Sequence, residues 1–283
     1  MSETPTRVKI CGITSLPDAE LALELGAWAI GMIFYEGSPR RCSLVDAQRI
    51  TAALHRKVEL CGVFVNEPLE LVVKTSEDLG LTMVQLHGDE GPAFCGEVPR
   101  RTGARVIKAA QVSGPGDVRD LERYHVDFHL LDARAQAQEK QKLRGGTGET
   151  FDWSLLSGRR SKVPLILSGG LNAENVARAI AATGPFAVDN ASGTESAPGK
   201  KDEGKLRAFF TAVASSTSAE ENVPGGAEDV PIAVTEPKSV DEAPSAEPEG
   251  ADDVSIALVE PKKADGDTER IAVTNAPSKG AAT

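Results

Sequence analysis

The stretch Val8-Lys-Ile-Cys-Gly-Ile-Thr-Ser-Leu-Pro-Asp18 contains the pattern on which the fold depends. It starts with a short apolar run, Val8–Cys11, and turns at the glycine that follows. The next part, Ser15-Leu-Pro-Asp18, resembles a capping box, in which a serine begins a helix and an acidic residue follows three positions later. Ser43-Leu-Val-Asp46 repeats this pattern after a second apolar run. The beginning of the chain therefore predicts two strands, each followed by a helix.

Apolar runs rich in Val and Ile recur along the chain and alternate with longer stretches of helical character. The eight candidate strands are Val8–Cys11, Ala29–Phe34, Val58–Val65, Met83–Leu86, Arg105–Lys108, Phe128–Asp132, Leu165–Ser168 and Phe186–Asp189. The runs are mostly continuous rather than alternating, which is typical of parallel strands buried on both faces. Eight strands, each followed by a helix, predict an α/β fold of the (β/α)8 TIM-barrel type rather than an open doubly wound sheet. No G-x-G-x-x-G sequence follows the first strand, which counts against a dinucleotide-binding fold.

The composition changes near residue 215. Residues 218–283 contain no Phe, Trp or Tyr and hold 15 Asp and Glu against 5 Lys and Arg, so they carry most of the formal net charge of −11. A segment rich in Pro, Glu, Ser and Ala with so high a charge cannot bury enough apolar surface to offset the entropy lost on ordering. We predict a barrel domain at residues 7–214 and a disordered acidic tail at residues 215–283.

The predicted tail contains a weak internal repeat. Asp229–Lys238 resembles Asp253–Lys262, since both contain Ile-Ala followed by Glu-Pro-Lys. Two such copies are too few and too short for a solenoid. They are either low-complexity sequence or short docking motifs for a partner, and the sequence does not identify that partner.

Composition also bounds location and cofactors. The chain has no run of 18 apolar residues, and its first residues lack the basic and apolar regions of a signal peptide. No two of its cysteines form a C-x-x-C pair, which gives no support for a zinc site. The four cysteines are Cys11, Cys42, Cys61 and Cys95. We expect a cytoplasmic protein with free thiols that binds no metal, membrane or nucleic acid.

Reacting groups of a (β/α)8 barrel lie at the C-terminal ends of the strands, where Cys11 and Asp132 occur. As a thiolate, Cys11 could remove a proton from carbon, although a free cysteine is more often a small buried hydrophobic residue. Partial burial could keep Asp132 protonated, so that it serves as an acid, or the residue could cap a loop. Position alone leaves both alternatives open for each residue.

Three glycine-rich turns follow the last three predicted strands. They are Arg144-Gly-Gly-Thr-Gly148, Ser168-Gly-Gly170 and Ala191-Ser-Gly193. The loops after the seventh and eighth strands are the usual phosphate site of such barrels, because backbone N–H groups and a helix N-terminus receive the anion there. Three such turns at successive strand ends favour a phosphorylated substrate over plain turns.

Other polar residues at the strand ends are further candidates. Arg40 and Arg41, after the second strand, suit bidentate capture of a carboxylate or phosphate, although a solvated surface pair is the competing interpretation. His87, Lys108 and Asp189 end the fourth, fifth and eighth strands and either point into the barrel mouth or are structural. No second ligand stands at metal spacing from the histidine.

Taken together, these residues resemble one known family, phosphoribosylanthranilate isomerase. The matching blocks are Lys9-Ile-Cys-Gly-Ile-Thr14, Gly31-Met-Ile-Phe-Tyr35, Ser38-Pro-Arg40, Gly62-Val-Phe-Val-Asn66, Val84-Gln-Leu-His-Gly88, Leu131-Asp132, Gly145-Gly-Thr-Gly148 with Phe151-Asp-Trp153, Leu167-Ser-Gly-Gly-Leu171, and Val188-Asp189 with Ser192-Gly193. The blocks match in order and spacing, and the resemblance covers Val8 to Phe210 but not the tail. The order of so many blocks makes the likeness much more specific than any single motif.

The resemblance implies the Amadori rearrangement of N-(5-phosphoribosyl)anthranilate to 1-(2-carboxyphenylamino)-1-deoxyribulose 5-phosphate, a step of tryptophan biosynthesis. It places the general base at Cys11, the general acid at Asp132 and the arginine for the anthranilate carboxylate at Arg40. It places the phosphate-binding residues at Gly146, Thr147, Gly148, Gly169, Gly170, Ser192 and Gly193. No cofactor is implied, because the cationic nitrogen formed on ring opening is itself the electron sink. The acid must be neutral near pH 7, and the base requires a lowered thiol pKa.

Some points remain open after the resemblance is considered. The stretch Asp189-Asn-Ala-Ser-Gly193 differs from the family's commoner Asp-Val-Ser-Ser-Gly, and either Arg40 or Arg41 could be the one that meets the substrate. The rival functions are the histidine-pathway isomerase, which has an aspartate where Cys11 stands, and a phosphate-binding barrel without catalysis whose tail recruits a partner. Monomer and homodimer are both compatible with the sequence.

Overall fold

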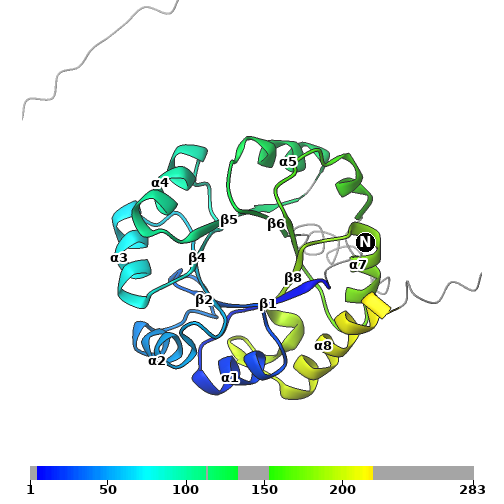
Figure 1. Ribbon diagram of the computed structural model, residues 1–283, viewed down its shortest axis with the longest axis horizontal. Coiled ribbons are helices and arrows are strands. Elements are labelled where there is room, and N and C mark those ends of the chain that lie inside the picture. The colour runs from blue at the N-terminus through cyan, green and yellow to red at the C-terminus, as the bar shows by residue number, and fades with distance from the viewer. Residues whose placement is uncertain (1–4, 113, 133–152, 219–283) are drawn as a thin grey trace, which may run out of the picture. The chain divides into compact units, whose positions relative to one another are not determined.

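The computed structural model describes residues 5–112, 114–132 and 153–218, and in them eight parallel strands form a closed barrel (Figure 1). The strands are β1 (Arg7–Cys11), β2 (Ala29–Ile33), β3 (Glu59–Phe64), β4 (Met83–Leu86), β5 (Arg105–Gln111), β6 (Phe128–Asp132), β7 (Leu165–Ser168) and β8 (Ala187–Asn190). Each pairs with the next, and β8 pairs with β1, for example Lys9 opposite Asp189. The predicted TIM barrel is confirmed, with strand ends shifted by a few residues.

The helices lie in a ring around the outside of the strands (Figure 1). They are α1 (Leu16–Glu24), α2 (Leu44–Leu54), α3 (Leu69–Leu79), α4 (Pro92–Thr102), α5 (Pro115–Asp120), α7 (Val176–Thr183) and α8 (Glu203–Ser218). Three short 3-10 helices are η1 (Leu121–Arg123), η2 (Trp153–Gly158) and η3 (Ser192–Thr194). A small antiparallel pair, β9 (Glu195–Ala197) and β10 (Lys200–Lys201), follows β8. In the described part of the chain, η2 follows β6, where the sequence predicted a regular helix.

The predicted helix starts are present. The hydroxyl of Ser15 accepts a hydrogen bond from the backbone N–H of Asp18 at 3.4 Å, and Ser43 accepts one from Asp46 at 3.1 Å. Each bond satisfies a backbone donor that has no partner inside the helix. These caps fix where α1 and α2 begin, and the longer loop between β2 and α2 carries Arg40.

The N-terminal end of the barrel is closed by aromatic side chains. Trp28, Phe128 and Phe186 lie where β2, β6 and β8 begin, with ring centroids 5.2 to 5.5 Å apart. The guanidinium groups of Arg7 and Arg105 lie 4.4 Å and 5.6 Å from the ring centroids of Phe186 and Phe128, respectively. Large apolar rings with cations over them exclude water from this end. The opposite end is left for the site.

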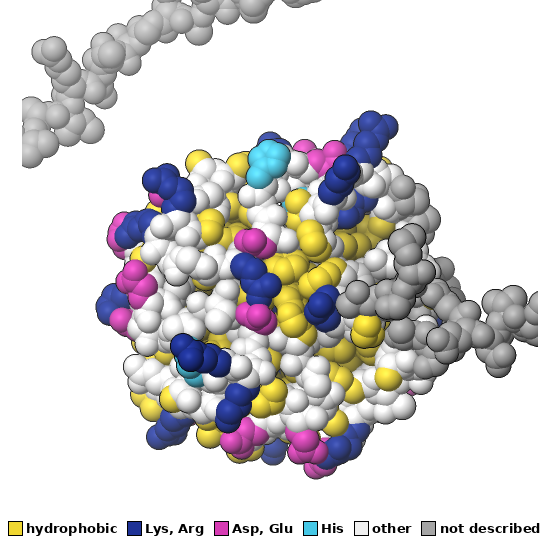
Figure 2. Space-filling model, in the orientation of Figure 1, with side chains coloured by type: hydrophobic (Ala, Val, Ile, Leu, Met, Phe, Trp, Pro, Cys, Tyr) yellow, Lys and Arg dark blue, Asp and Glu magenta, His cyan; other side chains and the backbone are white. Residues whose placement is uncertain are grey.

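The described residues can be compared with the expectations about membrane helices, metal-binding groups and the domain boundary. No helix among them is long and apolar enough to cross a membrane, and no group of three or more metal-binding side chains occurs among them. On the face drawn in Figure 2, charged side chains of both signs are interspersed with apolar ones. Helix α8 ends at Ser218, beyond the predicted domain boundary at residue 214. Residues 219–283, with the internal repeat, lie outside the described part.

Candidate active site

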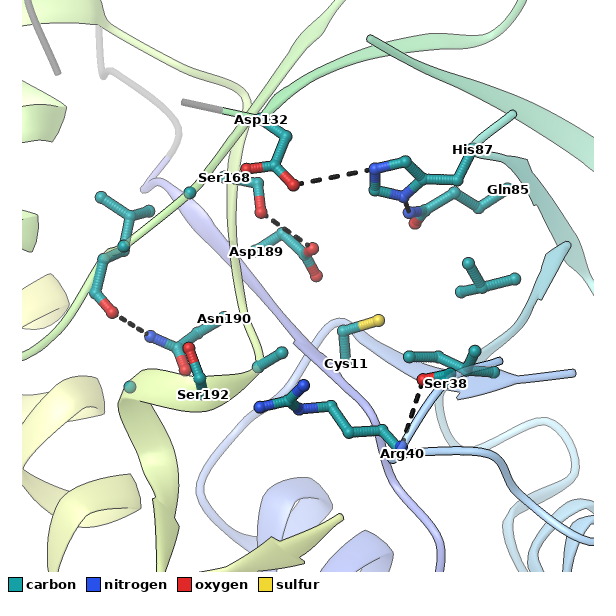
Figure 3. Close-up of a pocket in the computed structure, with 17 residues that line it drawn as sticks. Cys11, Ser38, Arg40, Gln85, His87, Asp132, Ser168, Asp189, Asn190 and Ser192 are labelled. Atoms are coloured by element: carbon teal, nitrogen blue, oxygen red, sulfur yellow. Dashed lines mark hydrogen bonds and ion pairs between the residues drawn. The ribbon is translucent and has the colours of Figure 1, made fainter. Parts of the chain in front are cut away.

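One pocket lies at the C-terminal ends of the strands, where the sequence placed the site (Figure 3). The predicted residues that line it are Cys11, Arg40, His87, Asp132, Gly169, Gly170, Asp189, Ser192 and Gly193. Asp132 and His87 lie on one side, Cys11 and Arg40 lie on the other, and Asp189 lies between them. Side chains that stand far apart in the sequence therefore share one cavity with two glycine turns, because parallel strands end at the same edge.

Cys11 is the last residue of β1 and is 5 % exposed. It lies beside Gly31 of β2, where a larger residue would find no room, since a Cβ on Gly31 would lie 2.8 Å from Sγ. Burial raises the pKa of the Cys11 thiol, while the charges of Lys9 and Lys201 lower it and the charge of Asp189 raises it. The expectation of a lowered thiol pKa is therefore wrong, because desolvation outweighs the two nearby cations.

A buried ion pair forms the floor of the pocket. Nζ of Lys9 lies 2.8 Å from Oδ1 of Asp189, and neither side chain is exposed by more than a few per cent. Burial lowers the pKa of Lys9, but the charges of Asp189, Cys11 and Cys61 and the hydrogen bond to Asp189 together outweigh burial and raise it. The hydroxyl of Ser168 donates to the other carboxylate oxygen at 3.3 Å. Asp189 therefore joins β1, β7 and β8 beneath the pocket.

The acid candidate, Asp132, faces a histidine. Oδ2 of Asp132 lies 3.7 Å from Nε2 of His87, and Nδ1 of the same ring lies 2.9 Å from the amide nitrogen of Gln85. If the amide donates to Nδ1, the ring proton is on Nε2 and points at the carboxyl group. Burial lowers the pKa of His87 and the charge of Asp132 opposes this, so the ring is neutral near pH 7. The neutral ring of His87 and the carboxyl group of Asp132 therefore face each other at one side of the pocket.

Arg40 is held in place by a carboxylate that stands 155 positions later in the chain. Nε of Arg40 lies 2.9 Å from both carboxylate oxygens of Glu195, and Nη2 lies 2.9 Å from Oε2. Glu195 also faces Nζ of Lys201 at 3.5 Å. Arg41, by contrast, is more than half exposed and pairs with Glu36 at 3.3 Å. Of the two candidate arginines, the structure therefore places Arg40 in the pocket and Arg41 on the surface.

Lys201 connects the site to the hairpin that follows it. Its ammonium group is buried and donates to the carbonyl oxygens of Cys11 and Ala191, each at 2.8 Å. Burial lowers the pKa of Lys201, and the charge of Glu195 opposes this. One side chain thus ties the end of β1 to the glycine turn after β8.

The two described glycine turns are built for close approach of a ligand. Gly169 and Gly170 have φ angles of +94° and +65°, which residues other than glycine rarely adopt. A Cβ on Gly193 would collide with the carbonyl oxygen of Leu171. Asn190 donates to that same oxygen at 2.7 Å. The asparagine that departs from the commoner family pattern therefore connects the turn after β8 to the turn after β7.

One predicted pocket residue is elsewhere. Nζ of Lys108 donates to the carbonyl oxygen of Gly88 at 2.5 Å and lies 2.9 Å from Oε2 of Glu90. Lys108 is not among the residues that line the pocket, so its prediction as a pocket residue is wrong. A lysine at a strand end can point along the barrel wall as well as into the mouth, and here a buried glutamate attracts it outward. Gly146, Thr147 and Gly148 lie outside the described residues.

Sequence reasoning missed Glu195 and Lys201. Their partners, Arg40 and Cys11, stand more than 150 positions away, so no local pattern joins them. Two signals were available. An acidic residue directly after an anion-binding turn requires a neutralising cation, and Pro198-Gly199 is a turn signal between two short strands.

Comparison with known proteins places this geometry in one group. A family model described as N-(5'phosphoribosyl)anthranilate (PRA) isomerase matches residues 8–212. An N-(5'-phosphoribosyl)anthranilate isomerase from Geobacter sp. (strain M21) is 46% identical over 204 residues, which cover 72% of this chain and 96% of the relative.

Solved structures agree with the sequence comparison. The crystal structure of phosphoribosyl anthranilate isomerase from Thermotoga maritima is 42% identical, with a TM-score of 0.66, and the match covers 74% of this chain and 99% of that one. A structure of phosphoribosyl anthranilate isomerase in complex with reduced 1-(o-carboxyphenylamino)-1-deoxyribulose 5-phosphate is 41% identical, with a TM-score of 0.64 and the same coverage. The match in all cases is to the barrel.

Proposed function

The chain belongs to the N-(5'-phosphoribosyl)anthranilate isomerase family, and from this premise we propose that Cys11 and Asp132 carry out the proton transfers of its reaction. The enzyme is an aldose–ketose isomerase of tryptophan biosynthesis, which converts N-(5-phosphoribosyl)anthranilate to the aminoketose by an Amadori rearrangement. The family match favours this activity over the histidine-pathway isomerase and over a barrel without catalysis. The observation that carries the residue roles is that Cys11 and Asp132 line one pocket.

Asp132 acts first in this mechanism. Its carboxyl group donates a proton to the ring oxygen of the ribose as the C1–O bond breaks and the nitrogen lone pair forms the protonated Schiff base. This step requires a neutral acid at the pocket wall, where Asp132 lies partly buried with Nε2 of His87 at 3.7 Å. After the step Asp132 is a carboxylate, and it regains its proton before the next turnover.

Cys11 acts second. Its thiolate removes the proton from C2, which the adjacent Schiff base has acidified, and the electron pair moves to the nitrogen to give an enolamine. The enolamine then takes up a proton at C1 and loses the proton of its C2 hydroxyl group to solvent, which gives the aminoketose. Because burial raises the pKa of Cys11, the thiolate needs positive charge nearby. The substrate supplies part of it, since the nitrogen becomes cationic just before Cys11 acts.

Two anchors orient the substrate between these groups. We assign the anthranilate carboxylate to Arg40, whose Nε and Nη2 are held by Glu195, so that its remaining N–H groups are available to a ligand. We assign the phosphate to the turns Gly169-Gly170 and Ser192-Gly193. Anchors at both ends of the substrate fix the reacting carbon relative to the two proton-transfer groups, which lowers the entropic part of the barrier.

The roles are tested with purified full-length protein and Cys11→Ala. Loss of the base should lower kcat by about 10²- to 10⁴-fold while leaving binding of a reduced product analogue nearly unchanged. Normal kcat in this variant would remove Cys11 from the mechanism. Wild-type protein should also restore growth of a tryptophan auxotroph, and failure by folded protein would favour a binding function.

The two adjacent arginines give a matched pair for the carboxylate anchor. Arg40→Ala should raise KM by about tenfold or more, because a charge-assisted bidentate contact is lost. Arg41→Ala removes the same charge from the exposed neighbour and should leave KM within about twofold. Equal effects of the two variants would contradict the assignment to Arg40.

Location and assembly are also proposals. A cytoplasmic enzyme is supported by the free cysteines and by its place in a biosynthetic family. A structure of mutually generated monomers of dimeric phosphoribosylanthranilate isomerase from Thermotoga maritima supports a homodimer or monomer for this chain as well. Size-exclusion chromatography with light scattering gives the mass of the protein in solution and so distinguishes monomer from dimer. A larger assembly would contradict both.

A further inference from the structure

Lys9 is a buried charge that the mechanism above does not use. It is wholly buried in the barrel, although long charged side chains are almost never fully buried unless paired. Its partner, Asp189, stands opposite it in the register of β1 and β8. Removing a charge from water costs several kcal/mol, so a barrel that needed only stability would fill this position with an apolar residue.

The geometry around Lys9 leads to Cys11. The two residues stand two apart on β1, so their side chains point to the same side of the sheet, into the barrel. Both end over Gly31 of the neighbouring strand: a Cβ at that position would lie 2.8 Å from Sγ of Cys11 and 3.2 Å from Nζ of Lys9. The missing side chain of Gly31 therefore leaves the space in which the thiol and the ammonium group lie side by side.

The charges around Sγ can be ranked by their effect. Of the two cations that lower the pKa of the Cys11 thiol, Lys9 has the larger effect and Lys201 the smaller. Asp189 acts in the opposite direction. The other ionisable groups that line the cavity are Arg40, His87 and Asp132, and the buried thiol of Cys61 also interacts with Lys9 and Cys11. Lys9 is thus the cation that most favours ionisation of Cys11, and Asp189 keeps it charged.

We propose that Lys9 is a positioning residue for the isomerase reaction: its ammonium group, held by Asp189, is the counter-charge of the Cys11 thiolate. The inference rests on the proposed role of Cys11 as the base. Four residues of β1, β2 and β8 therefore act together: Asp189 holds Lys9, Lys9 stabilises the sulfur anion of Cys11, and Gly31 leaves the space in which the two side chains meet. Cys11 passes its proton to solvent before substrate is processed, and the thiolate then accepts the C2 proton.

A second buried lysine pair shows how a structural pair differs. Lys108 has two backbone carbonyl oxygens and Glu90 as acceptors, and Glu90 in turn accepts from the backbone N–H groups of Asn66 and Gly88. That network is complete and joins the loops after β3 and β4. For Lys9, Asp189 is the acceptor that the described residues provide, and the rest of its ammonium group faces the sulfur. The Lys9–Asp189 pair, which lies beneath the pocket, is thus the pair whose lysine has fewer hydrogen-bond acceptors.

The test measures the thiolate directly. The full-length protein and its variants are treated with iodoacetamide over a range of pH, and alkylation of Cys11 is followed by peptide mass spectrometry, which separates it from the other cysteines. Lys9→Met should slow alkylation at neutral pH at least about tenfold, because a unit charge a few ångströms away in a protein interior changes an ionisation equilibrium by more than that. The rising limb of kcat/KM against pH should move to higher pH.

Asp189→Asn should have the opposite effect. The amide oxygen keeps the hydrogen bond from Lys9, and the Cys11 thiolate replaces Asp189 as the anion that keeps Lys9 charged, while the negative charge that opposes the thiolate is removed. Alkylation of Cys11 should become faster and its pH profile should move to lower pH. Opposite shifts from two changes in one ion pair are not expected of a purely structural pair, whose loss would loosen the pocket in both variants. This variant also keeps the proposal testable if Lys9→Met does not fold.

Lys108→Met is the matched control, since it removes another buried lysine from another buried pair. It should lower the melting temperature and leave the pH profile of Cys11 alkylation unchanged. Unchanged profiles in both pocket variants, or shifts in the same direction, would overturn the proposal. The alkylation rate does not depend on turnover, so it tests this proposal separately from the role of Cys11. An active Cys11→Ala variant would contradict the assignment of Cys11 as the base, whereas an unshifted alkylation profile would contradict the role of Lys9.

Discussion

The two ends of the barrel are made from the same eight strands but bury opposite kinds of side chain. The N-terminal end is closed by Trp28, Phe128 and Phe186, whose rings contact one another. The C-terminal end keeps polar groups such as Cys11 and Asp132 around a cavity. Desolvation of polar groups costs free energy, and burial of aromatic rings supplies it. The difference indicates that stability resides at one end and chemistry at the other, as is general for this fold.

Strand β6 tests this separation because it carries a residue of each kind, Asp132 at the open end and Phe128 at the closed end. Asp132→Asn should lower kcat by about 10²- to 10⁴-fold, since the amide cannot donate a proton to the ring oxygen. The melting temperature should stay within a few degrees of the wild type, because the change is nearly isosteric. Steady-state kinetics measures the change in kcat and thermal unfolding measures the melting temperature. A normal kcat would mean that another group is the acid.

Phe128→Ala is the reciprocal change on the same strand. Truncating a buried phenylalanine typically costs about 3–5 kcal/mol, and here it also removes the contacts with Trp28 and Phe186. We expect a large fall in the free energy of unfolding, measured with urea, and a kcat per folded molecule within about twofold of wild type. A variant that stays stable but loses kcat would show that the closed end controls the pocket, against the separation drawn above.

Glu195→Gln should have a smaller effect, confined to the open end. Glu195 holds Arg40 through two oxygens, and the neutral amide keeps at most one of these contacts. We expect KM to rise by about tenfold with little change in kcat, because a hydrogen bond between charged groups is worth about 1.5–3 kcal/mol. Glu36→Gln is the control, since Glu36 is 80% exposed and pairs with the surface residue Arg41. Equal KM changes in the two variants would mean that Glu195 does not position Arg40.

The same contrast explains which parts the sequence could predict. Strands such as Met83–Leu86 and caps such as Ser15 were predicted correctly, because they depend on neighbours within a few residues. The grouping of Cys11 with Asp132 followed from the rule that parallel strands end at one edge. The direction of the Lys108 side chain and the Glu195–Arg40 pair were not predictable in this way. Both are decided by contacts between residues far apart in the chain, which leave no periodic signal.

The raised pKa of the Cys11 thiol shows a further limit. A lowered pKa was expected from the sequence because a thiolate base must be populated near neutral pH. The outcome depends on how much water the fold removes from the sulfur, and here desolvation outweighs the cations. Sequence identifies the charges around a group, whereas only the packed structure decides whether charge or burial controls its ionisation.

The smallest expected effect concerns the barrel wall between the two ends, where His129 of β6 is 1% exposed. Burial lowers the pKa of His129, while the bond between Nε2 and the carbonyl oxygen of Tyr124 at 3.0 Å opposes this. Below about pH 6.5 the unfolded chain protonates this histidine and the folded one does not, so stability falls as pH drops from there towards the lowered value. His87 acts in the same direction.

Replacing His129 should therefore make the free energy of unfolding fall less as the pH is lowered. His129→Leu should lose less free energy of unfolding between pH 7 and pH 5 than the wild type, by on the order of 1 kcal/mol, in urea titrations followed by circular dichroism. His125→Leu is the control, because His125 is exposed on the neighbouring segment. The part of the loss that remains in His129→Leu should include the contribution of His87, which lies at the open end. If His129→Leu lost as much free energy of unfolding between pH 7 and pH 5 as the wild type, His129 would not contribute to the acid sensitivity. The titrating groups responsible would then lie in the pocket at the open end of the barrel.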